Sequence, residues 1–132
     1  MTMVLTLLLL IRPPQTLPDW LRIEAPTIIQ AAARNGVTSD FDLRLLFAIR
    51  QAERGRRGLE FGIMTPRANS LDLQAAHCAC TLKAQHKRHE AHACGLDFVA
   101  CLAARYCPIG ADNDPDGLNK NWLRLVRYFM QK

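Results

Sequence analysis

A stripe of apolar side chains that ends in a carboxylate is the feature that most constrains this chain. Leu46, Ile49 and Glu53 recur at helical spacing, so one helix face buries two aliphatic side chains and carries a glutamate one turn further on. Gly55 follows almost at once and can end the helix in a left-handed conformation. The pattern predicts a carboxylate at a helix end that faces a glycine-rich turn.

The start of this helix is predicted by its capping residues. Ser39 and Asp42 have the spacing of a capping box, with aspartate in place of the usual glutamate, so the helix should run from about residue 40 to Arg54. A short loop or a hairpin should follow over residues 55–69, and the hairpin alternative rests on the alternation of apolar and polar side chains over residues 59–64.

The remaining segments also favour helices. Pro26 should interrupt a first short helix, and a second should cover residues 26–34. Ser70 is a plausible cap for a helix over residues 71–93, with Leu73, Ala76, Cys80 and Leu82 on its apolar face, and Asp97 and Asn119 should cap the last two helices. No series of alternating strands is present. The sequence therefore predicts a mainly α domain of about five or six helices.

The chain of 132 residues is long enough for one domain with a core of its own. We expect an apolar and Pro-rich segment over residues 1–18 and a single helical domain over residues 19–132. The apolar run at residues 3–11 is too short to span a bilayer, for which about twenty residues are needed. A net charge of +5 favours anionic partners, and the bacterial cell wall, nucleic acid and acidic membrane surfaces all qualify.

Cysteines and histidines concentrate in the second half. The five cysteines cannot all pair within one chain and fall on predicted helices, so we expect reduced, packed thiols and synthesis in a reducing cytoplasm. His86, His89 and His92 suggest zinc, yet they drift around the helix face beside Lys87 and Arg88, and no C-x-x-C pair anchors them. We therefore expect no metal and no cofactor.

An aspartate-rich stretch near the C-terminus resembles half of a calcium loop. Asp112, Asp114 and Asp116 have the right spacing, but Leu123 stands where the bidentate glutamate belongs. An acidic turn before the last helix is the simpler interpretation.

Two further sets of residues bear on function. One is Ala48-Ile49-Arg50-Gln51-Ala52-Glu53 followed by Gly62-Ile63-Met64, and the other is Arg105-Tyr106-Cys107-Pro108, Asn113-Asp114-Pro115, Asn119 and Trp122. Together they resemble the lysozyme-like superfamily, in particular soluble lytic transglycosylases and phage lysozymes, over roughly residues 39–131. Arg54 and Thr65 depart from that pattern, which usually has serine and glutamine at these positions.

The resemblance implies a lysozyme-like fold and a peptidoglycan-cleaving muramidase or lytic transglycosylase that acts on the MurNAc-GlcNAc β-1,4 bond. Glu53 would be the general acid. Glu60, Met64, Tyr106 and Asp114 would contact the glycan strand, and Glu60 or Asp114 could serve as a second carboxylate. Other virion proteins are further candidate partners.

Two alternatives remain open at this point. Glu53 is flanked by Arg50, Arg54, Arg56 and Arg57, and a glutamate so placed can simply form surface ion pairs in a phage structural or adaptor module. The basic helices could also bind nucleic acid, although no recognition-helix, zinc-finger or RNA-binding motif is present. An enzyme should carry Glu53 in a cleft with Tyr106 within reach, whereas an adaptor should carry it on a convex, arginine-covered surface.

Overall fold

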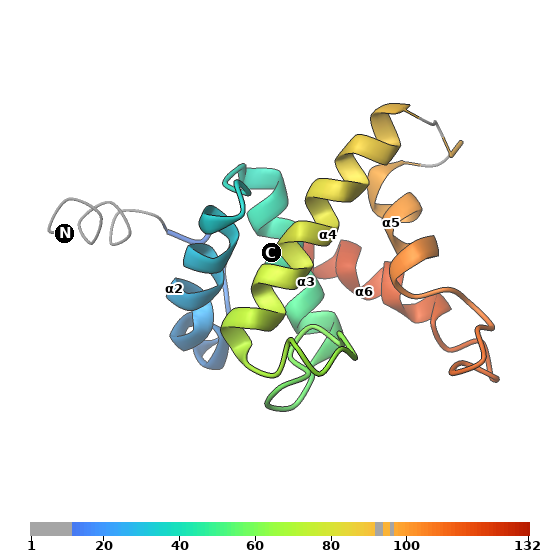
Figure 1. Ribbon diagram of the computed structural model, residues 1–132, viewed down its shortest axis with the longest axis horizontal. Coiled ribbons are helices and arrows are strands. Elements are labelled where there is room, and N and C mark those ends of the chain that lie inside the picture. The colour runs from blue at the N-terminus through green and yellow to red at the C-terminus, as the bar shows by residue number, and fades with distance from the viewer. Residues whose placement is uncertain (1–11, 92–93, 96) are drawn as a thin grey trace, which may run out of the picture.

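The computed structural model describes residues 12–91, 94–95 and 97–132. Within them the chain forms five α-helices and no strand, which confirms the mainly α fold class. The apolar run at residues 3–11, the end at residue 93 of the helix predicted over residues 71–93, and His92 lie outside the described residues. The helices are α2 (Asp19–Arg34), α3 (Asp40–Glu53), α4 (Leu71–Ala91), α5 (Phe98–Tyr106) and α6 (Lys120–Met130) (Figure 1).

The core is built around α3. Leu45, Leu46 and Phe47 are fully buried, so this helix is enclosed on more than the one face that its periodicity predicted. It packs chiefly against α6, while α2 packs chiefly against α4. Figure 1 shows α2 on one side of the molecule and α5 on the other, with α3 and α4 between them. Each large buried side chain contributes about 1.5–3 kcal/mol relative to an exposed one.

Both ends of α3 are fixed by local contacts. Ser39 Oγ accepts a hydrogen bond from the Asp42 amide at 3.1 Å, as the capping pattern predicted. The left-handed residue at the other end is Arg54, with φ 47°, and not Gly55 as predicted. Glycine is needed at position 55 for a different reason, since a Cβ there would overlap the carbonyl of Leu59. The helix consequently ends at Glu53.

The predicted break at Pro26 is wrong. One continuous helix runs from Asp19 to Arg34, with Pro26 inside it on the exposed face. Proline removes one backbone hydrogen bond, but the helix buries apolar side chains both before and after this position. They are Leu21, Ala25, Ile28, Ile29, Ala31 and Ala32. Packing of this face outweighs the local cost of the proline.

The predicted apolar face of α4 is correct only in part. Leu82 is buried, but Leu73 and Cys80 are exposed. The helix instead buries Gln74, Ala75, Cys78, Ala79, Leu82 and Gln85. The buried face of α4 is therefore rotated from the predicted one, because Gln74 is buried where hydrophobicity favoured Leu73. Of the loop or hairpin predicted after the Glu53 helix, the structure has the loop, since residues 54–70 form turns and irregular structure.

The segment before α2 is part of the folded unit. Leu17 belongs to the hydrophobic core, and Gln15 Nε2 donates to the carbonyl of Arg44 at 3.1 Å. Arg44 in turn donates to the carbonyls of Pro14 and Met130. The predicted boundary at residue 18 therefore cuts through packed chain.

Two further expectations concern cysteines and membranes. Cys94 and Cys101 form a disulfide, so the prediction of five reduced thiols is wrong for this pair, while Cys78, Cys80 and Cys107 are free. No described helix combines the length and the apolar character that a membrane span requires.

Candidate active site

The carboxylate of Glu53 is half-buried at the end of α3. Its Oε1 accepts a hydrogen bond of 2.8 Å from Trp122 Nε1 on α6, and within the described residues no ion pair to it is recorded. Burial raises the pKa of Glu53 above that of an ordinary glutamate, and the Trp122 hydrogen bond opposes this shift. Partial burial without a cationic partner is how a protein keeps a carboxylic acid protonated at higher pH.

The glycine at position 62 lets the backbone of the following loop approach this carboxylate. Gly62 has φ +72°, and a Cβ built on it would lie 2.7 Å from Glu53 Cδ, which is closer than real Cβ contacts come. Only glycine satisfies both the backbone conformation and the contact. The loop backbone therefore forms one wall around the acid.

Two aromatic rings form a second wall. Tyr106, the last residue of α5, stacks on Trp122 with ring centroids 5.1 Å apart and an interplanar angle of 24°. The Tyr106 hydroxyl donates to the carbonyl of Phe61, next to Gly62. Burial, and then the neighbouring Cys78 and Glu53, raise the pKa of Tyr106, so this hydroxyl stays a neutral donor. Tyr106 thus ties α5 to the loop while its ring fixes Trp122.

A buried thiol completes the surroundings. Cys78 on α4 is fully buried, with its Sγ 3.9 Å from the Tyr106 hydroxyl. Burial, with the nearby Glu53 carboxylate adding to it, raises the pKa of Cys78 to about 12. The thiol is neutral at physiological pH and does not act as a nucleophile there.

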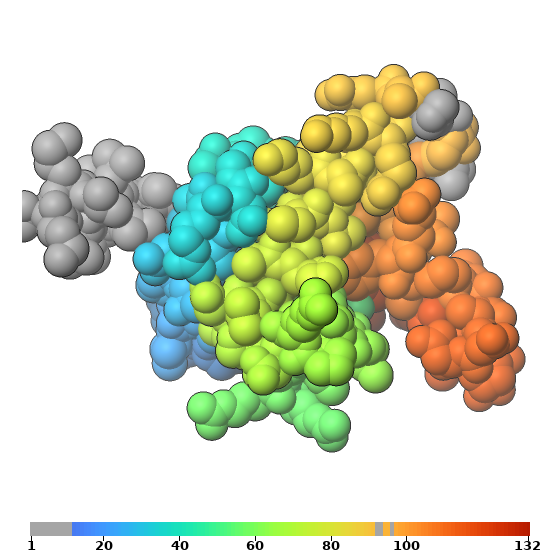
Figure 2. Space-filling model, in the orientation of Figure 1, coloured from blue at the N-terminus to red at the C-terminus, as the bar shows by residue number. Residues whose placement is uncertain are grey.

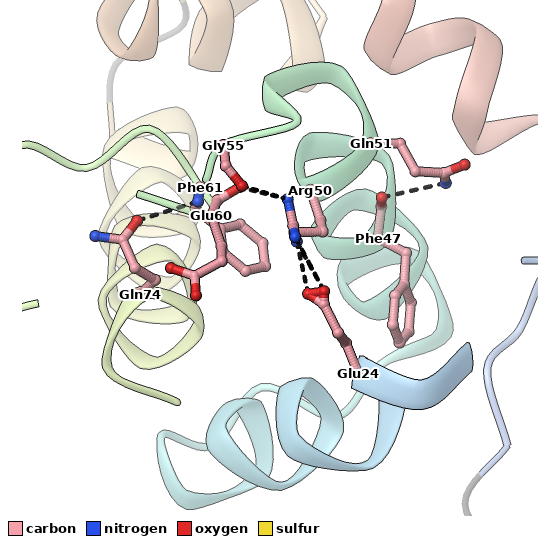
Figure 3. Close-up of polar contacts among 8 residues, drawn as sticks. All are labelled: Glu24, Phe47, Arg50, Gln51, Gly55, Glu60, Phe61 and Gln74. Carbon is pink, nitrogen blue, oxygen red and sulfur yellow. Dashed lines mark hydrogen bonds and ion pairs between the residues drawn. The ribbon is translucent and has the colours of Figure 1, made fainter. Parts of the chain in front are cut away.

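One glutamine holds the loop in place. Gln74 on α4 is fully buried, and its Oε1 accepts from the amides of Phe61 and Ile63 at 3.1 and 3.3 Å. Its Nε2 donates to the carbonyls of Ile63 and Ala68. Figure 3 shows Gln74 reaching from its helix to the loop. A single side chain thereby supplies the backbone partners that a strand would otherwise provide.

Arg50 holds the other side of the same loop. Its guanidinium pairs with Glu24 on α2, with Nε 2.9 Å from Oε1 and Nη2 3.0 Å from Oε2. Its Nη1 donates to the carbonyls of Gly55 and Glu60 at 3.2 and 3.3 Å (Figure 3). Arg50, a buried arginine of α3, is therefore paired with α2 and the loop rather than with Glu53, which argues against the ion-pair interpretation for this arginine.

The molecular surface is hollowed beside these elements. Figure 2 shows a depression between the loop that precedes α4, in green, and the segment that follows α5, in orange. Parts of α3 and of the red α6, the helices that carry Glu53 and Trp122, lie at the back of it. A separate apolar groove between α5 and α6, with Ala103, Ile109 and Leu123 among its walls, is lined by neither Glu53 nor Tyr106.

Three other residues predicted for the site, Glu60, Met64 and Asp114, differ from Glu53 in burial and in hydrogen bonding. Glu60 is 5% exposed, and its Oε1 has no hydrogen-bond partner among the described residues. Met64 is 80% exposed on the loop. Asp114 is buried, and its carboxylate accepts from the amides of Gly110, Leu118 and Asn119.

Those contacts give Asp114 a local role. Desolvation would raise its pKa, but the three backbone hydrogen bonds outweigh it and hold the pKa of Asp114 below its ordinary value. The carboxylate organises the turn between α5 and α6 rather than projecting from it. Asp114 is also the middle aspartate of the calcium-loop pattern, and these hydrogen bonds already use its carboxylate oxygens.

The sequence did not reveal the role of Gln74, and it indicated Trp122 only as part of the second set of residues that resembles lysozyme-like proteins. The signal for Gln74 is its phase, because it shares a helix face with Cys78 and Leu82 and so had to be buried. Trp122 belongs to the C-terminal part of the lysozyme-like pattern, but no spacing rule pairs it with Glu53. Their contact spans 69 residues.

This chain was compared with family models, curated proteins and solved structures. Neither the family models nor the curated proteins nor the solved structures contain a match to this chain. Within the described residues, the side chains grouped closely enough to hold a metal ion are His89, Cys94 and Cys101, which lie on other elements than Glu53.

Proposed function

We propose that this protein cleaves the β-1,4 glycosidic bond between N-acetylmuramic acid and N-acetylglucosamine in peptidoglycan, with Glu53 as the general acid. The observation that carries the proposal is the state of Glu53: a half-buried carboxyl with a raised pKa, held by Trp122 and enclosed by the Gly62 backbone. A group protonated near the working pH is what a glycosidic leaving oxygen requires. The sequence pattern around Glu53 supports the same chemistry.

The choice between hydrolysis and transglycosylation depends on a second carboxylate. A two-carboxylate glycosidase places its second group about 5–9.5 Å from the acid. Of the two candidates, Glu60 is enclosed in the interior and Asp114 is saturated by backbone amides. Neither is a free base in this conformation, so we favour the transglycosylase route.

In that route Glu53 acts twice. The protonated carboxyl first gives its proton to the leaving oxygen of the glycosidic bond. The resulting carboxylate then takes the proton from the 6-hydroxyl of the muramic acid, whose oxygen closes on the anomeric carbon and forms a 1,6-anhydro end. Proton count is restored, and no water is consumed.

The positive charge around the loop fits an anionic polymer. Arg54, Arg56, Arg57 and Arg67 are all exposed on or beside the loop that follows α3. Cell-wall glycan carries peptide carboxylates and, in many walls, attached phosphate polymers, so these side chains would attract the substrate and slow its release. Met64 and the rim near Tyr106 are the surfaces we expect the glycan to contact.

The test is digestion of purified, insoluble peptidoglycan by the wild type and by Glu53→Gln, with released fragments identified by mass spectrometry. We expect release by the wild type, a loss of about 10²–10⁴-fold in Glu53→Gln, and anhydro ends. The matched control is Glu90→Gln, at an exposed glutamate on α4, which should release fragments like the wild type. Hydrated reducing ends would reject the transglycosylase route. No release by a folded wild type across pH and wall types would reject the enzyme and leave an adaptor module.

A further inference from the structure

The connection between α4 and α5 gathers three side chains that metals bind. His89 on α4, Cys94 in the connection and Cys101 on α5 each place one ligand atom within 4.8 Å of the other two. Tetrahedral zinc, with bonds of about 2.0–2.3 Å to nitrogen and sulfur, needs its ligand atoms about 3.5 Å apart. Cys94 and Cys101 are bonded to each other in this structure, and reduction of that disulfide would let their sulfur atoms separate toward that spacing.

The two histidines on this part of α4 have different partners. His86 Nε2 lies 2.7 Å from Asp42 Oδ1, so this ring is already paired with α3. The Nδ1 of His89 is buried, and no hydrogen-bond partner for it is found among the described residues. A buried ring nitrogen without a partner costs free energy, so His89 has a capacity for a further ligand that the paired His86 lacks.

Phe98 fixes the orientation of both rings. It stacks on His86 with centroids 4.3 Å apart and meets His89 edge-on at 5.5 Å. Packing of this kind holds a ligand ring in position before the metal arrives, which lowers the cost of binding. The cluster is thus built by three segments that the fold already brings together.

The charge of the site also fits a divalent cation. Two thiolates carry two negative charges, and with a neutral histidine they balance one Zn²⁺ ion. Lys87 is exposed, so its repulsion is screened by solvent, whereas Arg88 beside His89 is half-buried and its repulsion is screened less. The two thiolates, which would bind the ion directly, must offset that charge. The sequence argument against zinc rested on the drift of the histidines around the helix face, on Lys87 and Arg88 beside them, and on the missing C-x-x-C pair. It did not bring Cys101 together with His89 and Cys94, as the structure does.

We propose that His89, Cys94 and Cys101 form a zinc site when the Cys94–Cys101 disulfide is reduced, with the fourth position taken by water. A dithiol reductant supplies two electrons and two protons to the disulfide and is itself oxidised to a disulfide. The two new thiols then lose their protons as Zn²⁺ binds, since the thiolate is the ligand. The oxidised and metal-bound forms exclude each other, because both use the same two sulfur atoms.

The consequence is that the α4–α5 connection is cross-linked in either redox state. Cys94 is exposed, so both reductant and metal can reach the site, while Cys101 is buried at the first turns of α5. The same helix ends at Tyr106, which stacks on Trp122. An oxidising compartment would select the disulfide, and a reducing one would select zinc.

Zinc binding by the full chain tests the proposal. Protein is reduced with a dithiol, desalted without oxygen, and titrated with Zn²⁺ against a chromophoric chelator, and with Co²⁺ to read the ligands. We expect one equivalent per chain, thiolate-to-cobalt charge transfer and tetrahedral cobalt absorption. The oxidised protein should bind no metal. His89→Ala and Cys94→Ser should each weaken binding by on the order of a hundredfold.

The controls are His77→Ala and Cys80→Ser, at exposed positions on the same helix, and both should bind as the wild type does. Helicity by circular dichroism shows that each variant is folded. The proposal would be overturned by no stoichiometric uptake by the reduced wild type, by cobalt spectra without thiolate bands, or by unchanged affinity in Cys94→Ser. Equal binding by oxidised protein would also overturn it.

Discussion

At the scale of single residues, the account depends on how Glu53 is enclosed. Trp122, Gly62 and the ring of Tyr106 surround its carboxyl, and each contributes something different: a hydrogen bond, room for the backbone, and a support for the indole. Their effects can be separated because each can be changed alone.

Gly62→Ala should displace the acid. The substitution adds a Cβ that overlaps the Glu53 carboxylate and places an L side chain at φ +72°. Gly110→Ala is the matched control, because its φ is +73° but nothing lies within 4 Å of the added Cβ. The free energy of unfolding of both variants should fall by about 1–2 kcal/mol, because each places an L side chain on a left-handed backbone. Only Gly62→Ala should also lose glycan-cleaving activity, by roughly a hundredfold, and equal activities of the two variants would contradict this.

Trp122→Phe should shift the pH dependence of activity. The indole hydrogen bond lowers the pKa of Glu53, so its removal should raise that pKa further. Activity that needs the protonated acid should then persist to higher pH than in the wild type. The measurement is the pH profile of fragment release. Trp20→Phe is the control, because it changes a tryptophan whose ring lies against Arg50. A profile that moves to lower pH would count against the assignment.

At the scale of elements, the loop between α3 and α4 is held by side chains rather than by strands. Gln74→Ala removes the partners of four backbone groups at once. Each buried group left without a partner costs about 1–3 kcal/mol, and partial hydration of the opened loop should keep the total near 3 kcal/mol. Gln30→Ala, on the exposed face of α2, should change stability little. Urea unfolding measures both, and similar losses would refute the role of Gln74.

The Arg50–Glu24 pair connects α2 to α3 and to the loop. The side chains are 10% and 17% exposed, so removing the arginine leaves a largely buried carboxylate without its partner. Arg50→Met should lower the free energy of unfolding by about 3–5 kcal/mol. Arg22→Met is the control, because Arg22 and Asp19 form an exposed pair on α2, for which about 0–1 kcal/mol is expected. Thermal unfolding distinguishes the two.

These elements show what the sequence could and could not predict. Capping residues and apolar periodicity located α3 and α5 well, because their signals are local. The last helix, α6, does begin after Asn119, but this side chain makes no capping hydrogen bond and donates to the carbonyl of Pro108 instead. The continuity of α2 through Pro26 and the burial of Gln74 depend on tertiary packing, which no local rule contains. The apolar stripe placed Glu53 at a helix end facing a glycine-rich turn, and the resemblance to lysozyme-like proteins gave it the role of an acid. Its hydrogen bond to Trp122 was not predicted, because that contact depends on how the whole fold packs α6 against α3.

At the scale of the whole molecule, the raised pKa of Glu53 links the site to stability. Folding raises this pKa, so the folded chain holds the proton more tightly than the unfolded chain does. The stability that this group contributes is complete at low pH and is lost as pH rises through the folded-state pKa. Glu53→Gln should therefore be more stable than the wild type at neutral pH, and the difference should shrink in acid. Chemical unfolding at several pH values tests this, and a difference that grows in acid would contradict it.

The central claim is that Glu53 is an acid poised to protonate a glycan. The most direct measurement is the titration of the Glu53 carboxyl by carbon NMR, together with the pH profile of peptidoglycan fragment release from the same preparation. We predict that the carboxyl titrates above the ordinary glutamate value of about 4.3, and that release falls as pH rises through that same pKa. An ordinary pKa, or release that does not follow the titration of Glu53, would contradict the account.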